Sequence, residues 1–307
     1  MSALFDIIAR ECAAPVFPAA KAFADELRTR YGDATAAVVF YGSCLRAQTD
    51  AGLILDFYVI VDRLQPALGN PISALGARVL PPNVYYQEMA YEDRKLRAKV
   101  AVIRADQFLR GTGPDAFTSA LWARFAQPSA ILYARNGEME RRIIDALANA
   151  VTTTAVRTAA LFTQPFTARD LWVRAFRETY AAELRPESAG KSIELIERDL
   201  ARYEAVTAAL FGDGRDAQGG LYPAPNDEAA RDKALATWRL RRIAGKTLNA
   251  ARLIKAAFTF NGGLDYAVAK IERHSGVKIE LSEKEKRTPL ITGVRLFFKV
   301  RKRGGLN

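Results

Sequence analysis

The residues that could do chemistry in this chain are concentrated in two short stretches, 37–46 and 55–62. The first is an apolar run that ends in Gly42 and Ser43, and the second is an apolar run with Asp56 near its start. Short apolar runs of β-favouring residues are typical of buried strands. A glycine at a strand end lets the backbone approach a triphosphate, and Ser43 adds a hydroxyl donor. Together the two stretches indicate a site for nucleotidyl transfer.

Further predictions concern the phosphates and a metal. The sequence predicts a helix that begins at the glycine turn, with its first N–H groups directed at phosphate oxygens and Arg46 about one turn inside. Asp56 lies on a buried strand, where a carboxylate is costly without a partner, so we expect it to bind Mg²⁺. Both features also have purely structural explanations, because glycine is common at strand ends and Asp56 could face solvent.

Neighbouring segments must position these residues. We predict that residues 100–103 form a strand paired with residues 83–90 across a turn at 92–94, with Lys99 at its head. Lys99 is then either a site residue or an edge lysine that reaches water. Helical spacing covers residues 136–150, 168–183 and 192–211, and the Gly-, Pro- and Asp-rich residues 212–227 mark a linker or loop.

Gly-Ser at a strand–helix turn, followed by an acidic strand, resembles the nucleotidyltransferase superfamily that includes polymerase β. The resemblance implies an α/β fold with a mixed sheet. That superfamily has two carboxylates spaced i, i+2 on the acidic strand, whereas this chain has Asp56 followed by Tyr58. The missing second carboxylate favours an alternative, a non-catalytic lipid-binding protein on the same fold.

A closer resemblance is to the mitochondrial-type phosphatidate cytidylyltransferases, peripheral enzymes that make CDP-diacylglycerol from CTP and phosphatidic acid. It keeps the chain order from about residue 38 to 187, and in this family the aspartate strand also reads Asp-hydrophobic-hydrophobic. The matching stretches are Tyr41-Gly-Ser, Leu55-Asp-Phe, Val84-Tyr-Tyr86, Lys99-Val-Ala-Val-Ile103, Gln127-Pro128, Phe166-Thr-Ala-Arg-Asp-Leu171 and Tyr180-Ala-Ala-Glu-Leu-Arg185.

This resemblance implies roles for matching positions. Asp56, Ser43 and Lys99 are the implied catalytic residues, with Mg²⁺ on Asp56 and Lys99 at the triphosphate or the lipid phosphate. The implied nucleotide-binding residues are Gly42, Ser43, Arg46, Tyr180, Glu183 and Arg185. The reaction joins CMP to a phosphorylated lipid and releases pyrophosphate. Because the lipid phosphate is already ionised, positioning supplies most of the rate.

Charge is distributed unevenly along the 307 residues, whose net charge is +11. Residues 231–307 hold 19 Lys and Arg against 6 Asp and Glu. Apolar residues at helical spacing beside these cations predict a segment that lies on an anionic membrane. The same charge would also suit RNA, so a nucleotidyltransferase acting on RNA or on a soluble phosphate is a second alternative. A solvated charged face is the third explanation.

The remaining composition restricts the class of protein. Cys12, Cys44 and the one histidine, His274, match no zinc site, disulfide framework or His-based triad. No apolar run is long enough to span a bilayer, and the N-terminus has no signal-peptide core. We therefore expect a cytoplasmic protein, peripheral on the inner face of the membrane, that binds CTP, phosphatidic acid and anionic lipid and no nucleic acid.

The predicted organisation has three parts. Residues 1–135 form a polymerase-β-like nucleotidyltransferase domain, and residues 136–230 form a mostly helical domain. The second domain of the resembling family is winged-helix-like, which the helical pattern permits. Residues 231–307 form the basic amphipathic, membrane-associating segment.

Overall fold

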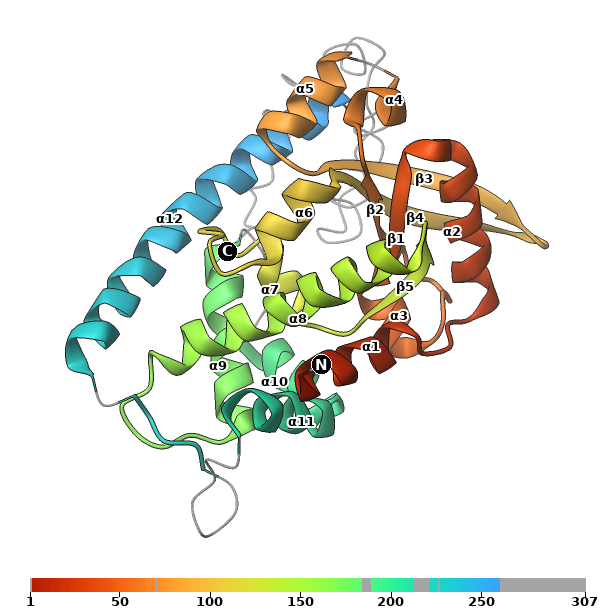
Figure 1. Cartoon of the computed structure of the whole chain (residues 1–307). Helices are drawn as coiled ribbons and strands as arrows, with labels where there is room; N and C mark the ends of the chain where they lie inside the picture. The colour runs from red at the N-terminus through yellow and green to blue at the C-terminus, as the bar shows by residue number, and fades with distance from the viewer. Residues whose placement is uncertain (1, 70, 184–188, 213–220, 226, 260–307) are drawn as a thin grey trace, which may run out of the picture.

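The computed structural model describes residues 2–69, 71–183, 189–212, 221–225 and 227–259. Within these residues a five-stranded mixed sheet has helices on both faces, and further helices pack beside it (Figure 1). The predicted fold class, a mixed sheet followed by a mostly helical region, is confirmed.

The sheet has the strand order β3-β4-β2-β1-β5. β2 and β4 are parallel, and the other neighbouring pairs are antiparallel. The strands span Thr35–Tyr41 (β1), Leu55–Val61 (β2), Asn83–Tyr91 (β3), Arg94–Arg104 (β4) and Ser129–Ala134 (β5). Because β1 and β2 are antiparallel neighbours, the end of β1 and the start of β2 lie at the same end of the sheet.

Alternate residues of the central strands enter two separate apolar cores, one on each face. Phe40 and Phe57 pack with Phe23 on one face, whereas Val39 and Tyr58 belong to the core on the other face. The first face is covered by α2 (Pro18–Tyr31), α4 (Leu64–Leu68) and α5 (Pro71–Val79). The second face is covered by α1 (Ala3–Cys12), α6 (Ala105–Thr112), α7 (Trp122–Phe125) and α8 (Gly137–Ala159).

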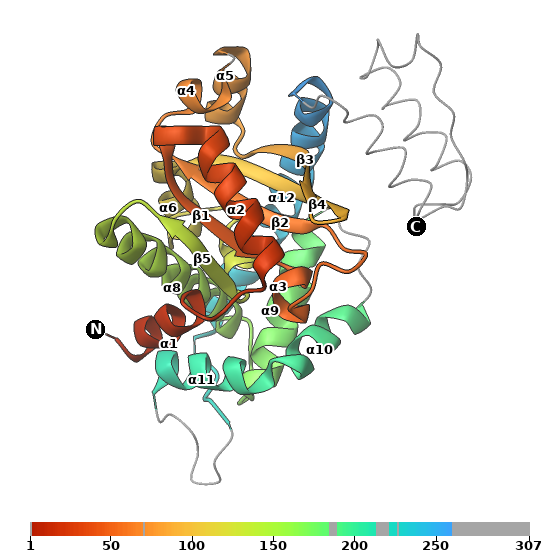
Figure 2. The same ribbon diagram turned by 90° about the vertical axis from the view of Figure 1, so that its right-hand side faces the viewer.

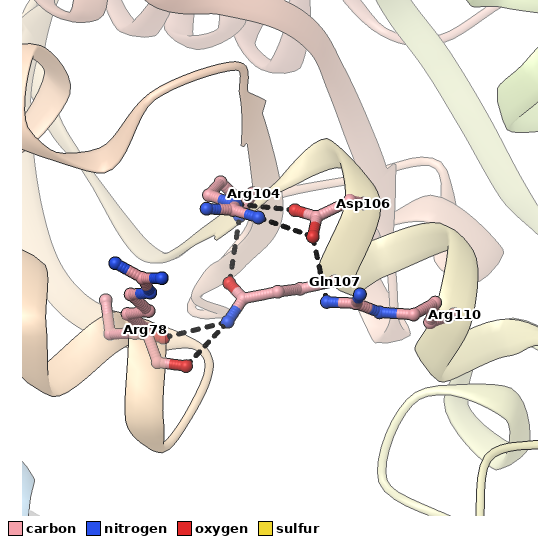
Figure 3. A network of polar contacts seen from close by, with 6 residues as sticks. Arg78, Arg104, Asp106, Gln107 and Arg110 are labelled. Carbon is pink, nitrogen blue, oxygen red and sulfur yellow. Dashed lines mark hydrogen bonds and ion pairs between the residues drawn. The ribbon is translucent and has the colours of Figure 1, made fainter.

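A polar cluster joins the C-terminal end of β4 to the helices around it (Figure 3). The Arg104 side chain donates two hydrogen bonds of 2.5 Å to Asp106, and Arg110 donates one of 2.8 Å to the same carboxylate. Gln107 donates to the carbonyl of Arg78 at 2.9 Å and so ties α6 to α5. The pKa of Asp106 is lowered, chiefly by the hydrogen bonds from Arg104. Both of the arginines that contact Asp106 therefore have a carboxylate partner.

The second half of the chain is built around α9 (Ala168–Ala182), which contacts α8 and three later helices (Figure 2). These are α10 (Ala189–Arg198), α11 (Leu200–Phe211) and α12 (Glu228–Thr259). Trp172 and Phe176 of α9 lie in the same apolar core as Tyr58 of the sheet. One core therefore crosses the predicted boundary at residue 135, and the division into domains, like the winged-helix arrangement, stays a prediction.

The described part of the basic C-terminal segment is a helix packed on the protein body. Trp238 of α12 is 1% exposed, and its indole N–H donates to the carbonyl of Arg157 at 3.2 Å. A Cβ added at Gly245 would lie 2.2 Å from the carbonyl oxygen of Ala182, so α12 and α9 are in direct backbone contact. Residues 260–307, which include His274, lie outside the described residues. Among the described helices, none is both long enough and apolar enough to cross a membrane.

Several predicted elements differ in their bounds. The predicted hairpin is β3 and β4, but β4 already begins at Arg94, so Lys99 lies in mid-strand and not at the head. The helix predicted over residues 192–211 is two helices, α10 and α11, which break at Asp199, whose φ of −119° and ψ of 28° are not helical. The region 168–183 is α9, with Glu183 as its C-cap.

Candidate active site at one end of the sheet

Five side chains form one row across the sheet where β1 ends and β2 begins. The register pairs Ser129 with Tyr41, Tyr41 with Asp56, Asp56 with Lys99, and Lys99 with Tyr86. Register partners on neighbouring strands point to the same face. Asp56 therefore lies between Tyr41 and Lys99, on the face that Tyr58 shares.

Gly42 follows β1 and lies directly against Asp56. Its φ is 92°, and an added Cβ would be 2.8 Å from Oδ2 of Asp56. Both the backbone conformation and the available space require glycine here. The predicted helix begins at the next residue, the exposed Ser43, but α3 (Ser43–Ala47) has only 5 residues. The backbone at Gly42 and the Ser43 hydroxyl are therefore the accessible donors at this turn.

Lys99 forms a long ion pair with Asp56. The distance from Nζ to Oδ1 is 3.8 Å, and the two side chains are 40% and 21% exposed. A pair of this length and exposure contributes little to stability. Both groups reach the surface, where a charged ligand can approach them.

Arg124 of α7 lies beside Tyr58, which is the residue at the i+2 position from Asp56 on β2. Its Nη1 donates to the hydroxyl of Tyr41 at 3.2 Å and lies 3.5 Å from that of Tyr58. Its guanidinium carbon lies 5.6 Å and 6.0 Å from the centres of the two rings, within range of a cation–π interaction. Burial raises the pKa of the Tyr41 hydroxyl well above its ordinary value, so this group stays neutral.

Electrostatics keep the Arg124 guanidinium charged. Burial acts to lower its pKa, but surrounding groups outweigh burial and raise the pKa well above its ordinary value. Those groups are Tyr41, Tyr58, Glu183 and Asp56. The Tyr58 side chain, at the i+2 position from Asp56, therefore ends against a cation.

Three further predicted site residues, Arg46, Tyr180 and Glu183, lie in α3 and at the C-terminal end of α9. Arg46 donates a hydrogen bond of 3.1 Å to the side-chain oxygen of Gln127, which lies just before β5, and this contact directs Arg46 to Gln127 and not to Asp56. Tyr180 stacks on Phe176 in α9, and the backbone N–H of Glu183 donates to the Tyr180 carbonyl at 3.1 Å. Arg185 lies outside the described residues. The structure therefore brings together Gly42, Ser43, Asp56 and Lys99, and the Glu183 carboxylate acts on the Arg124 guanidinium.

Arg252 of α12 is a residue that the sequence did not assign to the site. Its Nε donates to the carbonyl of Pro81 at 3.0 Å, and Nη1 donates to Asn249 at 3.3 Å. Burial lowers its pKa, and Tyr58, Arg124 and Glu183 also act on the guanidinium. For Arg124, the signal in the sequence was a cation inside the apolar stretch 121–126; for Arg252 no local signal exists.

The donor set for a metal is small. Within the described part of the chain, no group of three or more His, Cys, Asp or Glu side chains could hold a metal ion. Asp56 fits a different arrangement, in which Mg²⁺ binds one protein carboxylate together with substrate phosphates and water. A side chain at position 42 would crowd Oδ2 of that carboxylate, because its Cβ would lie 2.8 Å away.

Comparison with known proteins finds similarity among solved structures. No protein-family model matches the chain, and no curated protein matches it. Among solved structures, the chain is similar to a nucleotidyltransferase-like protein from Exiguobacterium sibiricum 255-15, at a TM-score of 0.27 and 10% identity over 92% of this chain and 91% of that chain. A TM-score this low does not establish a shared fold, so the architecture rests on the strand order and register of the chain itself.

Proposed function

We propose that this protein is a nucleotidyltransferase that moves a nucleoside monophosphate from a triphosphate to a phosphate-bearing acceptor. The observation that carries the proposal is the contact between Gly42 and Asp56, where a turn without space for a side chain faces a carboxylate on the adjacent strand. Backbone and carboxylate so close together can bind phosphates and the cation that accompanies them.

The proposed reaction assigns roles to the Gly42 turn and to two residues of the row, Asp56 and Lys99. The backbone at Gly42 and the hydroxyl of Ser43 bind the β- and γ-phosphates, and Lys99 offsets the charge that develops on the α-phosphate. Asp56 would hold Mg²⁺, which would neutralise phosphate charge when bound. An acceptor oxygen attacks the α-phosphorus, a new P–O bond forms, and the bond to the β-phosphate breaks to release pyrophosphate.

The finer assignment is that the nucleotide is CTP and the acceptor is a lipid phosphate, most simply phosphatidic acid, giving CDP-diacylglycerol. It is supported by the resemblance over residues 38–187, on which Tyr180, Glu183, Arg185 and Arg46 would complete the nucleotide site. A peripheral position on the anionic membrane is supported by the charge of residues 231–307. Deletion of residues 286–307 should then weaken binding to anionic vesicles.

A second candidate, a protein that binds lipid phosphate without catalysis, is favoured by one observation. Tyr58 and Arg124 occupy the region where a second metal-binding carboxylate is expected. Such a protein would bind vesicles that contain phosphatidic acid but would not bind nucleotide in the presence of Mg²⁺.

The test is turnover by the purified full chain. The protein is incubated with CTP, Mg²⁺ and a panel of lipid phosphates, soluble phosphates and RNA. We expect pyrophosphate release with one lipid phosphate, and mass spectrometry should show that this lipid has gained one cytidylyl group. Pyrophosphate release with RNA or a soluble phosphate alone would change the acceptor and leave the reaction class intact. Absence of release with the whole panel, together with absence of nucleotide binding, would refute the proposed function.

A further inference from the structure

Arg124 and Arg252 make no hydrogen bond or ion pair with a carboxylate among the described residues. Arg124 is bonded to phenol hydroxyls, and its Nε is buried without a hydrogen-bond partner within the described part of the chain. Arg252 is bonded to the Pro81 carbonyl and the Asn249 amide oxygen. Burying a charge without an opposite charge is costly.

The polar cluster at Arg104 differs from this arrangement, because its arginines have a direct carboxylate partner. There, Arg104 and Arg110 both contact the carboxylate of Asp106 (Figure 3). Among the described residues, Arg124 and Arg252 donate hydrogen bonds to neutral groups, and the Glu183 carboxylate acts on both guanidinium groups from a greater distance. Asp56 also acts on Arg124 but is shared with Lys99, so three cations face the carboxylates of Asp56 and Glu183. A bound anion would offset the excess of positive charge.

The position of this charge relative to Asp56 follows from the strand register. Gly42 comes after Tyr41, the partner of Asp56, and so lies outward of the row. Tyr58 is two residues inward along β2, about 7 Å from Asp56 at the usual strand rise. Arg124 donates to Tyr41 in the row and reaches inward to Tyr58. Arg252 binds the carbonyl of Pro81, just before the β3 residue Val84, which is in register with Tyr58 through Ala101. The two arginines therefore lie on the inward side of the row, whereas the Gly42 turn lies on its outward side.

We infer that Arg124 and Arg252 form a second anion subsite, which binds the phosphate group of the acceptor while the Gly42 turn binds the nucleotide. Guanidinium groups present planar pairs of N–H donors that match a phosphate. The inference rests on the proposed function for its assignment to the acceptor. It also gives α12 a role in binding substrate, in addition to any role of the chain beyond it at a membrane.

The test is calorimetric titration of the full chain with inorganic phosphate, with and without a non-hydrolysable CTP analogue at saturation. We expect phosphate to bind in the presence of the analogue, and Arg252→Gln to weaken that binding at least tenfold. Arg252→Lys keeps the charge but not the planar pair of donors, so it should weaken phosphate binding less than Arg252→Gln does. It also provides a test if the glutamine variant fails to fold. Arg239→Gln removes an exposed cation from the same helix and should change nothing.

Steady-state kinetics distinguish an effect on acceptor binding from an effect on nucleotide binding. Arg252→Gln should raise KM for the acceptor at least tenfold and leave KM for the nucleotide unchanged. The kinetics are measured with two acceptors, glycerol 3-phosphate and a short-chain phosphatidic acid. The inference is overturned if the analogue excludes phosphate, because the arginines then bind the nucleotide, or if Arg252→Gln and Arg252→Lys bind phosphate as wild type does. If the protein binds no nucleotide at all, the proposed function fails, while loss of phosphate binding in Arg252→Gln would still identify the anion subsite.

Discussion

The two halves of the candidate site are held in place by different forces. Asp56 and Lys99 belong to adjacent strands and Gly42 directly follows β1, the strand on the other side of Asp56, so the backbone hydrogen bonds of the sheet fix their relative positions. Arg124 and Arg252 come from α7 and α12, and their positions depend on how those helices pack. Substitutions in the strand half should therefore reduce turnover and leave the fold intact. Substitutions in the helix half should change acceptor binding and the free energy of unfolding together.

The largest effect is expected at Asp56. Asp56→Asn keeps the shape of the side chain but removes the charge that would hold the metal, and turnover should fall by about 10²–10³-fold or more. The matched control is Asp62→Asn at the other end of β2, where the carboxylate pairs with Arg135 and turnover should be unchanged. Steady-state kinetics and circular dichroism check both variants; full activity in Asp56→Asn would remove this residue from the mechanism.

The next effect separates backbone strain from loss of space. Gly42→Ala and Gly52→Ala both place a side chain at positive φ and should each cost about 1–2 kcal/mol of stability. Only Gly42→Ala would push a Cβ against Asp56, because the space around Gly52 is open. We expect calorimetry to show a nucleotide affinity about tenfold lower for Gly42→Ala alone, a loss of about 1.4 kcal/mol. Equal affinities in the two variants would contradict the proposed phosphate turn.

A substitution between α9 and α12 tests the helix half. Gly245→Ala would place a Cβ 2.2 Å from the carbonyl oxygen of Ala182, so the helices must separate at a cost of about 1–3 kcal/mol. Gly76→Ala is the control, because its Cβ would meet only the Lys255 side chain at 3.6 Å. Denaturant unfolding should show Gly245→Ala destabilised and Gly76→Ala unchanged or slightly stabilised, and kinetics should show a higher acceptor KM for the former only.

The smallest effect concerns pH. Burial, and then the neighbouring Arg252, lower the pKa of Lys255 to about 8. An unfolded lysine has a pKa of about 10.4, so between these values the unfolded state binds more protons and stability rises with pH. We expect the stability of wild type relative to Lys255→Met to increase from about pH 8 to about pH 10 and to be level below this range. Lys246→Met, at an exposed position of α12, is the matched control for removal of a lysine from this helix. Parallel pH profiles of wild type and Lys255→Met in denaturant unfolding would contradict the lowered pKa.

The strand half of the site could be predicted because its signals are local. A glycine and a carboxylate at the ends of two apolar runs define the turn and the acidic strand without knowledge of the rest of the fold. The helix half could not, because Arg252 reaches the site only through the packing of α12 on α9. Apolar residues at helical spacing beside cations are the same pattern in a helix that packs on protein and in one that lies on lipid.

The most direct test of the central claim follows the phosphates of the nucleotide. With CTP labelled at the α-phosphate, the acceptor should become labelled in wild type and remain unlabelled in Asp56→Asn. With CTP labelled at the γ-phosphate, the label should leave as pyrophosphate. Transfer of the γ-label to the acceptor, its release as inorganic phosphate, or absence of any transfer from the α-labelled nucleotide would contradict a nucleotidyltransferase site at Gly42 and Asp56.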